Sequence, residues 1–167
     1  MDAMKEEALR RVKKSPTDQP SVCSCVNLRR ASRAITRVYD DALQPAGLKV
    51  TQYSVLANLS RAGAVSVSTL ARMLRLDRTT LVRNLKALER AGLVEEAPSS
   101  DPRERGVSLS EAGRGAVTQA RPRWQQAQQL IEERLGADGV RQLGALALAL
   151  EELMGQDASV EESAESE

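Results

Sequence analysis

The sequence predicts a mainly α-helical fold with one small β-hairpin, and three observations lead to it. Aromatic residues are scarce, with no Phe, one Trp and two Tyr in 167 residues, so the core must consist of Leu, Ala and Val. Such a core suits helices better than sheets. Apolar residues also recur at steps of three and four along most of the chain. A strand-like pattern replaces this period only between residues 93 and 110.

The N-terminal part of the chain predicts an arm followed by a helix. Residues 1–22 are charged and then proline-containing, as in KKSPTDQPS, so we expect a flexible arm. The helical pattern occupies residues 23–47 and stops at the sequence QPAG, residues 44–47. Its apolar positions are Leu28, Ala31, Ile35, Val38 and Ala42.

Two short helices are predicted next, at the start of a segment that covers residues 48–110. The first begins after Thr51 as its N-cap and ends at Gly63. The second is capped by Ser66, and its apolar residues are Leu70, Ala71 and Leu74.

A further helix follows a tight turn at residues 75–76. Asp77 serves as its N-cap, the helix covers residues 78–91, and Gly92 closes it. One face is apolar, whereas the opposite side carries Thr, Arg and Lys. The apolar face consists of Leu81, Leu85 and Leu88.

The hairpin comes directly after this helix. LVEEA is the first strand, PSSDPRER is the turn, and GVSLS is the returning strand. A short helix, a tight turn, a polar-faced helix and a hairpin with a basic tip occur in the order of a winged helix-turn-helix. We therefore predict a DNA-binding domain over residues 48–110, with residues 98–106 as the wing.

Residues 111–155 predict two C-terminal helices. Ser110 caps a long helix that runs to about Leu135, with a kink at Pro122. A last helix, residues 140–154, has one apolar face formed by Val140, Leu143, Leu146, Leu150 and Leu153. The acidic stretch 156–167 predicts a disordered tail.

Candidate DNA contacts follow from the geometry of the duplex. A helix fits the major groove and reads bases with its N-terminal side chains, so helix 78–91 is the candidate recognition helix. Ser66 and Thr69, near the start of the preceding helix, are candidates for phosphate contact. The candidates on the recognition helix are Arg78, Thr79, Thr80, Arg83, Asn84 and Lys86.

The wing adds two arginines, Arg103 and Arg105, close to Asp101. A flexible basic tip can enter the minor groove, where a narrow width concentrates negative potential. Asp101 lies close to the expected phosphates, which is understandable if it holds an arginine in place through a charge-assisted pair. The alternative is an ordinary amphipathic helix and a solvated hairpin. The order of both elements and their matching caps favour DNA binding.

The segment LARMLRLDRTTLVRNLKALERAGLVEEAPSSDPRERGVSLSEAG, residues 70–113, resembles the MarR family of bacterial transcription regulators. The marks are the L-A-x-x-L…D-R-[ST]-T helix-turn-helix, the ERAGLVE exit and the D-x-R-x-R wing followed by L-[ST]-x-x-G. This resemblance implies a homodimer that binds palindromic operator DNA, usually as a repressor. It also implies that Arg103 or Arg105 enters the minor groove, with Asp101 as its organiser.

The apolar stripes of the outer helices predict dimerisation. The first helix, the long helix after Ser110 and the helix 140–154 all carry more apolar surface than a small winged domain needs. Pairing them with a two-fold mate buries this surface and separates two recognition helices by roughly 34 Å, one turn of DNA. A monomer with an ordinary helical core is the alternative.

Other function classes find little support in the composition. The chain has no His, which removes the commonest general base and metal ligand, and we find no phosphate-binding glycine loop. We therefore expect neither enzyme activity nor a cofactor. Without a signal-like or membrane-length apolar run, a cytoplasmic protein with reduced thiols is expected. The formal net charge of +1 does not indicate a partner.

The only two cysteines, Cys23 and Cys25, lie where the first helix begins. The register places Cys25 along the inward edge of that helix, with Arg29 one turn further on. A helix N-terminus and a nearby guanidinium both favour the thiolate form, which oxidises most readily. The sequence CVNLRRASRAITRVYDDAL also resembles the first helix of the organic-hydroperoxide-responsive branch of the MarR family. In that branch the reactive cysteine matches Cys25 and a tyrosine matches Tyr39, whereas Arg29 replaces a second tyrosine.

Three interpretations of the cysteines remain open. Cys25 is a redox sensor, resolved by a thiol such as Cys23 of the partner subunit. Alternatively, the C-x-C pair binds a soft metal, with a dimer offering four thiolates. Finally, the cysteines are inert, and a small aromatic ligand or no ligand is the signal. Outside DNA binding altogether, the alternative function is a thiol or metal adaptor protein.

Overall fold

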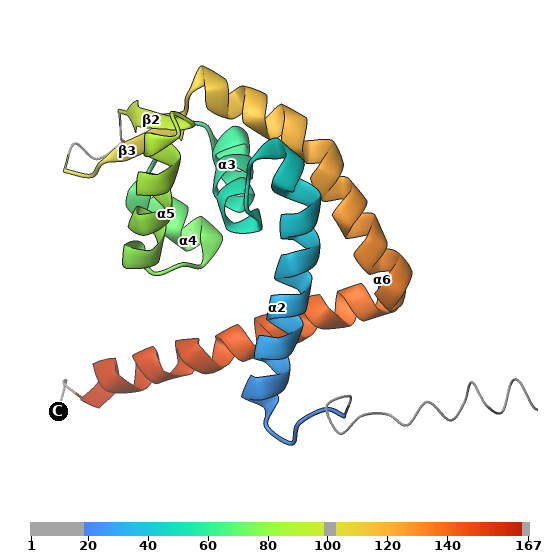
Figure 1. The fold of residues 1–167 in the computed structure, drawn as a ribbon. Coiled ribbons are helices and arrows are strands. Elements are labelled where there is room, and N and C mark those ends of the chain that lie inside the picture. Colours follow the sequence, from blue (N-terminus) through green and yellow to red (C-terminus); the bar gives the residue numbers. More distant parts are fainter. Residues whose placement is uncertain (1–18, 99–102, 165–167) are drawn as a thin grey trace, which may run out of the picture. The chain divides into compact units, whose positions relative to one another are not determined.

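The computed structural model describes residues 19–98 and 103–164 and has the mainly α-helical fold with a small sheet that the sequence predicts (Figure 1). The elements in chain order are α2 (Ser24–Leu43), the 3-10 helix η2 (Gln44–Ala46), α3 (Val50–Ala62), β1 (Val65–Ser66), α4 (Val67–Leu74), α5 (Arg78–Arg90), β2 (Val94–Ala97), β3 (Gly106–Leu109) and α6 (Glu111–Ala164). The winged helix-turn-helix order is thereby confirmed.

The chain forms two compact units, Met1–Arg37 and Val38–Glu167. The described part of the first unit is the N-terminal part of α2 and the short segment before it. Most of the predicted arm, residues 1–18, lies outside the described residues. The second unit contains everything from the end of α2 onward. Within it, we call α3 to β3 the lobe.

The lobe has an aliphatic core. Leu side chains from α3, α4 and α5 meet Val107 of β3, and each is at most 1% exposed. The leucines are Leu56, Leu59, Leu70, Leu81, Leu85 and Leu88. Leu81, Leu85 and Leu88, the predicted apolar face of helix 78–91, all lie in this core. Their burial fixes α5 with its opposite face toward solvent. Burial of aliphatic surface is the main force that holds these short helices together.

Two of the predicted helix caps are present in the lobe. The Oγ atom of Ser66 accepts a hydrogen bond from the backbone N–H of Thr69 at 3.1 Å. Asp77 Oδ1 accepts one from the backbone N–H of Thr80 at 2.8 Å. Between the two helices, Arg75 adopts the left-handed conformation with φ 51°, which produces the predicted tight turn.

The start of α3 corrects the sequence analysis. The N-cap is Lys49, two residues before the predicted Thr51, and the helix begins at Val50. The backbone N–H of Val50 donates to Asp40 Oδ1 at 2.8 Å, and that of Lys49 donates to Gln52 Oε1 at 2.9 Å. A carboxylate on α2 therefore satisfies a free donor at the helix start, which local sequence does not reveal.

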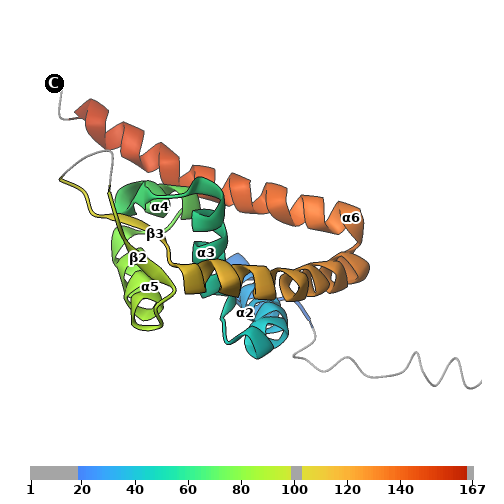
Figure 2. The ribbon, with the colours of Figure 1, turned by 90° about the horizontal axis from the view of Figure 1, so that it is seen from above.

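The sheet has three strands in the order β1-β3-β2, all antiparallel. The two hairpin strands are those predicted, whereas β1 was not predicted. In the register, Glu96 faces Val107 across the hairpin, and Ser66 faces Gly106 on the other side of β3. A Cβ atom on Gly106 would lie 2.3 Å from the Ala97 carbonyl oxygen, so this close strand approach requires glycine. The hairpin lies beside α5 in two perpendicular views (Figures 1 and 2).

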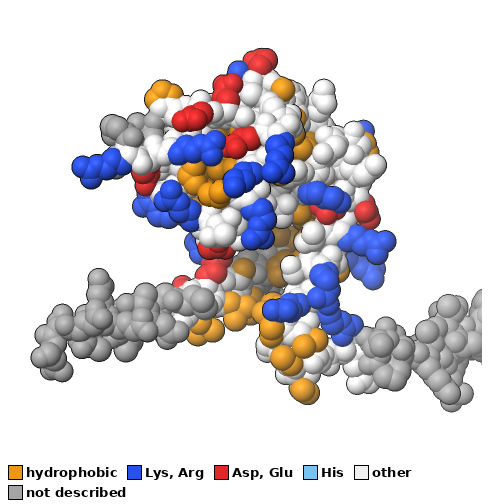
Figure 3. All heavy atoms as spheres, turned by 60° about the vertical axis from the view of Figure 1, so that its left-hand side comes forward, with side chains coloured by type: hydrophobic (Ala, Val, Ile, Leu, Met, Phe, Trp, Pro, Cys, Tyr) orange, Lys and Arg blue, Asp and Glu red, His pale blue; other side chains and the backbone are white. Residues whose placement is uncertain are grey.

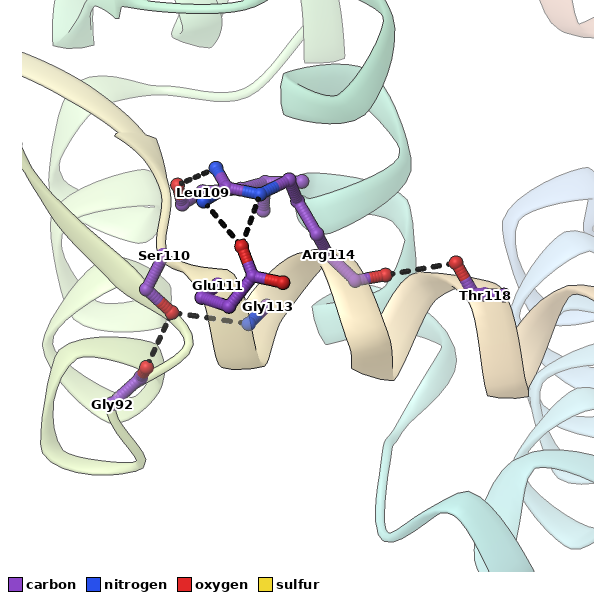
Figure 4. A network of polar contacts seen from close by, with 7 residues as sticks. All are labelled: Gly92, Leu109, Ser110, Glu111, Gly113, Arg114 and Thr118. Carbon is purple, nitrogen blue, oxygen red and sulfur yellow. Dashed lines mark hydrogen bonds and ion pairs between the residues drawn. The ribbon is translucent and has the colours of Figure 1, made fainter.

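A polar joint connects the lobe to α6 (Figure 4). Ser110 Oγ donates to the Gly92 carbonyl at 2.6 Å and accepts from the Gly113 N–H at 3.0 Å. Arg114 Nη1 donates to the Leu109 carbonyl at 2.9 Å. A Cβ atom on Gly113 would lie 2.0 Å from the Leu93 carbonyl oxygen. The L-[ST]-x-x-G motif is therefore a helix cap followed by a point of close backbone contact.

The predicted kink at Pro122 is wrong in its position. Pro122 lies inside α6, and the residue with a non-helical backbone is Gly136, with φ 71° and ψ 162°. Proline's fixed φ is compatible with a helix, whereas glycine reaches positive φ without steric cost. The break at Gly136 divides α6 into two helices, close to the predicted helix end at Leu135.

The helix continues to Ala164, although the acidic composition of residues 156–167 predicts a disordered tail. Glu, Ala, Gln and Met are favourable helix formers, and extending an existing helix adds a hydrogen bond for each residue ordered. Only residues 165–167 of the predicted tail lie outside the described residues.

Candidate nucleic-acid interface

The first turn of α5 presents polar side chains to solvent. Arg78 and Thr79 are exposed, and Thr80 is half-buried. Capping by Asp77 orients this turn, and its hydrogen bonds with Thr80 hold the pKa of the Asp77 carboxyl below its usual range. Since the cap fixes where α5 begins, it also fixes the direction in which the candidate base-reading residues point.

The rest of α5 keeps its polar side toward solvent. Arg83 and Lys86 are exposed, and Asn84 is half-buried. These three polar residues alternate along α5 with its buried leucines. The leucine face packs into the core of the lobe, so the polar side chains lie on the opposite face of α5. All six contact residues predicted on the candidate recognition helix thus lie on α5.

The start of α4 offers hydroxyl groups beside α5. Ser66 is only 6% exposed and its Oγ atom serves as the cap of α4. Thr69 and Ser68 are half-buried and therefore more accessible than Ser66. Arg78 Nη1 donates to Ser68 Oγ at 3.5 Å, which joins the first turns of the two helices. Sequence reasoning missed Ser68, because its role depends on this contact between helices.

The two wing arginines differ in their surroundings. Both are exposed, but Arg105 Nη2 pairs with Glu89 Oε1 of α5 at 2.5 Å. The Arg105 carbonyl also accepts from the backbone N–H of Val67 at 3.0 Å, so this residue is anchored at the base of the wing. Arg103 lies nearer to the tip. Asp101, the predicted organiser, lies outside the described residues.

Glu104, between the two arginines, was not predicted as a site residue. Hydrogen bonds from the hydroxyls of Ser66 and Ser68 lower the pKa of its carboxyl below the usual range, and the charges of Arg78 and Arg72 act in the same direction. The only signal for Glu104 in the sequence is its position between Arg103 and Arg105. The residues that act on its carboxyl lie far from it along the chain.

Basic side chains gather on this side of the molecule. Figure 3 views the side that carries the hairpin, and Lys and Arg side chains are numerous over it, with fewer Asp and Glu between them. The exposed basic residues of the helix-turn-helix and wing are Arg72, Arg75, Arg78, Arg83, Lys86, Arg90, Arg103 and Arg105. This concentration of positive charge suits a polyanionic partner.

The cysteines are free thiols at the start of α2. The helix begins at Ser24, so Cys25 lies in its first turn and Cys23 directly precedes it. Asn27 bonds back to the main chain of Ser21 at 2.8 Å and 2.6 Å, which fixes the segment around Cys23. Cys25 and Arg29 are both exposed in the described chain, so the predicted inward position of Cys25 stays a prediction about the dimer. The apolar stripe that defined "inward" is itself uncovered there, since Leu28 is 43% exposed.

Tyr39 belongs to an aromatic cluster instead of standing free. Its hydroxyl donates to Gln128 Oε1 at 2.5 Å, and its ring stacks on Trp124 with 6.4 Å between centroids. Tyr53 stacks on the same Trp at 6.0 Å. Burial, followed by the charge of Glu132, raises the Tyr39 pKa above its usual value. The three aromatic residues of the chain thus join α2, α3 and α6.

Two other features, a metal site and a membrane-spanning helix, are absent from the part of the chain that the structure describes. No three Cys, Asp or Glu side chains there form a group that could hold a metal ion. None of the helices described is long and apolar enough to span a membrane.

Comparison with known sequences gives two matches. A sequence model of the MarR family matches residues 46–103. The uncharacterised HTH-type transcriptional regulator YwoH of Bacillus subtilis is 30% identical over 83 residues. This match covers 50% of the present chain and 61% of YwoH.

Solved structures extend the similarity beyond the lobe. The M. tuberculosis transcriptional regulator MosR, crystallised in complex with DNA, is 36% identical and has a TM-score of 0.70. That match covers 78% of this chain and 98% of MosR. A cysteine-to-serine mutant of E. coli MarR, crystallised with operator DNA, is 26% identical with a TM-score of 0.66. The match covers 74% of this chain and 89% of the MarR chain.

Proposed function

This chain belongs to the MarR family of bacterial transcription regulators, and we propose that it represses transcription as a homodimer bound to a palindromic operator. A member of this family is a DNA-binding regulator and not an enzyme. The observation that carries the proposal is the arrangement of α5 and the wing. Capping and packing present a polar, basic helix face, and an exposed basic hairpin lies beside it.

In the proposed complex α5 lies in the major groove and the wing, residues 98–106, in the minor groove. Arg78, Thr79, Thr80 and Arg83 supply donors for base edges, with Asn84 and Lys86 beside them. Thr69 and the start of α4 meet phosphates. We assign the minor groove to Arg103, which lies nearer to the tip of the wing, and place Arg105 at the wing base beside Glu89.

Dimerisation is supported by where the exposed apolar side chains lie. Of the large exposed hydrophobic residues described, all except Met73 belong to the start of α2, the residues just before it, or α6. On α6 they are Leu130, Leu135, Leu143, Leu146, Leu148, Leu150 and Leu153. Water-exposed leucines in this number favour association with a second copy. We accordingly assign residues 23–47 and 111–155 to the dimer and 48–110 to DNA.

The DNA-binding proposal is tested by removing one arginine from each contact element. Arg83→Ala and Arg103→Ala should each weaken operator binding by about ten- to a hundredfold, the effect of losing one good base or groove contact. The matched control is Arg123→Ala, an exposed arginine on α6. Measured affinity should also fall with salt at a log–log slope near −0.9 for each phosphate neutralised. Binding that ignores salt would refute this mode of recognition.

For the signal, we propose oxidation of Cys25, which the exposure of both thiols supports. The thiolate of Cys25 attacks a hydroperoxide, giving a sulfenic acid and releasing an alcohol. The thiol of Cys23 of the partner subunit then displaces water to form a disulfide. Tyr39 contributes less than the resemblance implies, because its hydroxyl is bonded to Gln128. A small aromatic ligand or a soft metal bound by the thiols is the alternative signal.

Hydroperoxide treatment distinguishes these signals. The parent protein should lose operator affinity on treatment, Cys25→Ser should keep it, and Cys23→Ser should stop at the sulfenic acid. If the parent and Cys25→Ser respond equally, Cys25 is not the switch. The thiol or metal adaptor alternative predicts no operator binding in any of these samples.

A further inference from the structure

Glu89 is an acidic residue on the helix that the proposed function places in the major groove. It is the second-last residue of α5 and directly follows the fully buried Leu88, so packing of the helix fixes where its side chain begins. That side chain is 27% exposed. A carboxylate on a DNA-binding helix weakens binding by like-charge repulsion with phosphates. Its presence there therefore calls for a compensating contact.

The contact is an ion pair with the wing. Arg105 Nη2 donates to Glu89 Oε1 at 2.5 Å, and the Arg105 side chain is 44% exposed. Arg105 is the last residue before β3, so the pair connects the wing to the C-terminal end of α5. The Arg105 guanidinium is thereby directed toward α5 instead of extending freely from the hairpin.

The main chain at Arg105 is held by other elements. Its carbonyl accepts from the N–H of Val67, the first residue of α4, at 3.0 Å. The next residue, Gly106, is paired with Ser66 of β1 on one side and with Ala97 of β2 on the other. The wing base, residues 105–107, therefore has its backbone fixed by α4 and the sheet, and the side chain of Arg105 fixed by α5.

In the proposed complex the Arg105 guanidinium has two kinds of anion to choose from, the Glu89 carboxylate and the DNA phosphates. Without Glu89 this side chain would be drawn to phosphate, because a guanidinium pairs readily with phosphate oxygens. Glu89 is a competing acceptor at a position fixed by the core of the lobe. A partly exposed ion pair contributes little alone, but together with the backbone attachments it fixes an orientation.

We propose that Glu89 is a positioning residue for DNA recognition, which holds Arg105 against the end of α5 and so sets the placement of the wing relative to that helix. Arg103 and the first turn of α5 then meet the minor and major grooves together. This arrangement raises affinity because part of the ordering cost is met before DNA binds. The inference rests on the proposed function, since it assigns a role within the same interface.

The first test compares two variants of the full-length protein on an operator fragment enriched from genomic DNA. Glu89→Gln removes the charge and keeps the size of the side chain. Glu95→Gln is the matched control, since it makes the same charge change at an exposed position of β2. We expect Glu89→Gln to bind roughly two- to fivefold more weakly than the parent, the range for a partly exposed ion pair. Glu95→Gln should bind as well as the parent or slightly better, because it only removes a negative charge.

A double-mutant cycle tests whether Glu89 acts through Arg105. The losses from Glu89→Gln and Arg105→Gln should be less than additive, because either substitution breaks the same pair. Arg105→Gln should also leave the salt dependence of binding unchanged. A log–log slope smaller in magnitude by about 0.9 would show that Arg105 neutralises a phosphate, which would overturn the inference.

Footprinting separates positioning from a general loss of stability. In the Glu89→Gln complex, hydroxyl-radical protection should weaken where the wing contacts the minor groove and be retained at the half-site centres. Weakening at both places in equal measure would indicate lost stability and would overturn the inference.

The sign of the affinity change is the sharpest outcome. If Glu89→Gln binds as tightly as Glu95→Gln, or more tightly, the Glu89 carboxylate only repels phosphate and the inference is wrong. Failure of the parent to bind any enriched fragment would instead overturn the proposed function.

Discussion

At the scale of single residues, helix caps determine where the candidate contact groups point. Asp77 fixes the first turn of α5 and Ser66 that of α4, each by one hydrogen bond from a backbone N–H. The Asp77 carboxylate accepts a stronger, charge-assisted hydrogen bond while it is ionised than after it is protonated, which makes this cap sensitive to acid. The hydroxyl of Ser66 does not titrate in this range, so the Ser66 cap is not sensitive to acid.

Replacement of Asp77 tests the cap. We expect Asp77→Ala to lower the Tm and Asp77→Asn to keep most of it, because an amide oxygen also caps a helix. The folded-state pKa of Asp77 lies below its ordinary value of 3.8, so its contribution to stability is present above that value. The contribution is lost as the pH falls through the folded pKa. The difference in Tm between the parent and Asp77→Ala should therefore shrink in acid, and a pH-independent difference would contradict this origin.

Residues differ in how far sequence alone could predict them. Asp77 and Ser66 follow a local rule, because the capping residue and its partner lie three positions apart. Glu104 follows no such rule, since Ser66 and Ser68 reach it only after the wing folds back on α4. Cys25 was predicted on the inward edge of the first helix, along an apolar stripe that the dimer is expected to bury. In the single described chain, Leu28 of that stripe is 43% exposed, so its burial depends on a second copy that the sequence of one chain does not show.

At the scale of elements, the joint at Ser110 connects the three parts that a regulator must couple. Its hydroxyl bridges the end of α5, at Gly92, and the start of α6, while β3 leads directly into it (Figure 4). A displacement of α6 would therefore be transmitted to α5 and the wing together. Packed elements joined in this way move as bodies and not by gradual bending.

Two glycines of α6 provide a matched test of this joint. Gly113→Ala should destabilise the protein, because the new methyl group would overlap the Leu93 carbonyl oxygen at 2.0 Å. Gly115→Ala has nothing within 4 Å and should stabilise the helix by up to about 1 kcal/mol. Urea unfolding of both variants measures the difference. Equal effects of the two substitutions would show that Gly113 is not confined by the joint.

Elements with strong local signals were predicted well, and those defined by distant contacts were not. The hairpin strands and the helix-turn-helix carry clear periods and caps. Strand β1 has only two residues and forms because it pairs with β3. Two residues are too few for a periodic pattern to predict a strand. The start of α3 depends on Asp40 of α2. The break in α6 fell at Gly136 because glycine tolerates positive φ, while Pro122 fits a helix.

At the scale of the whole molecule, the distribution of apolar surface indicates two different uses of leucine. Most leucines of the lobe are almost fully buried, as the composition predicted for a core without Phe. Leucines of the second half of α6 remain exposed, with Leu146 at 60% and Leu153 at 61%. The proposed dimer would bury this second set, which accounts for a composition richer in leucine than the lobe requires.

A charge placed within this exposed stripe should dissociate the dimer. Leu146→Glu introduces a carboxylate on the side shared with Leu143 and Leu150, where burial without a partner is costly. Ala145→Glu adds the same charge on roughly the opposite side of the helix and serves as the control. Light scattering after size exclusion should give a smaller mass for Leu146→Glu alone. A parent that is already monomeric at micromolar concentration would refute the dimer.

The most direct measurement of the central claim is selection of genomic DNA by the purified full-length protein. Two α5 helices related by a two-fold axis should enrich fragments that share a palindrome. Its half-site centres should lie about one helical turn apart, roughly 10–10.5 base pairs. Enriched fragments with this symmetry would support dimeric recognition through α5 and the wing. Enrichment no greater than that of bulk DNA, or of a single unpaired half-site, would contradict it.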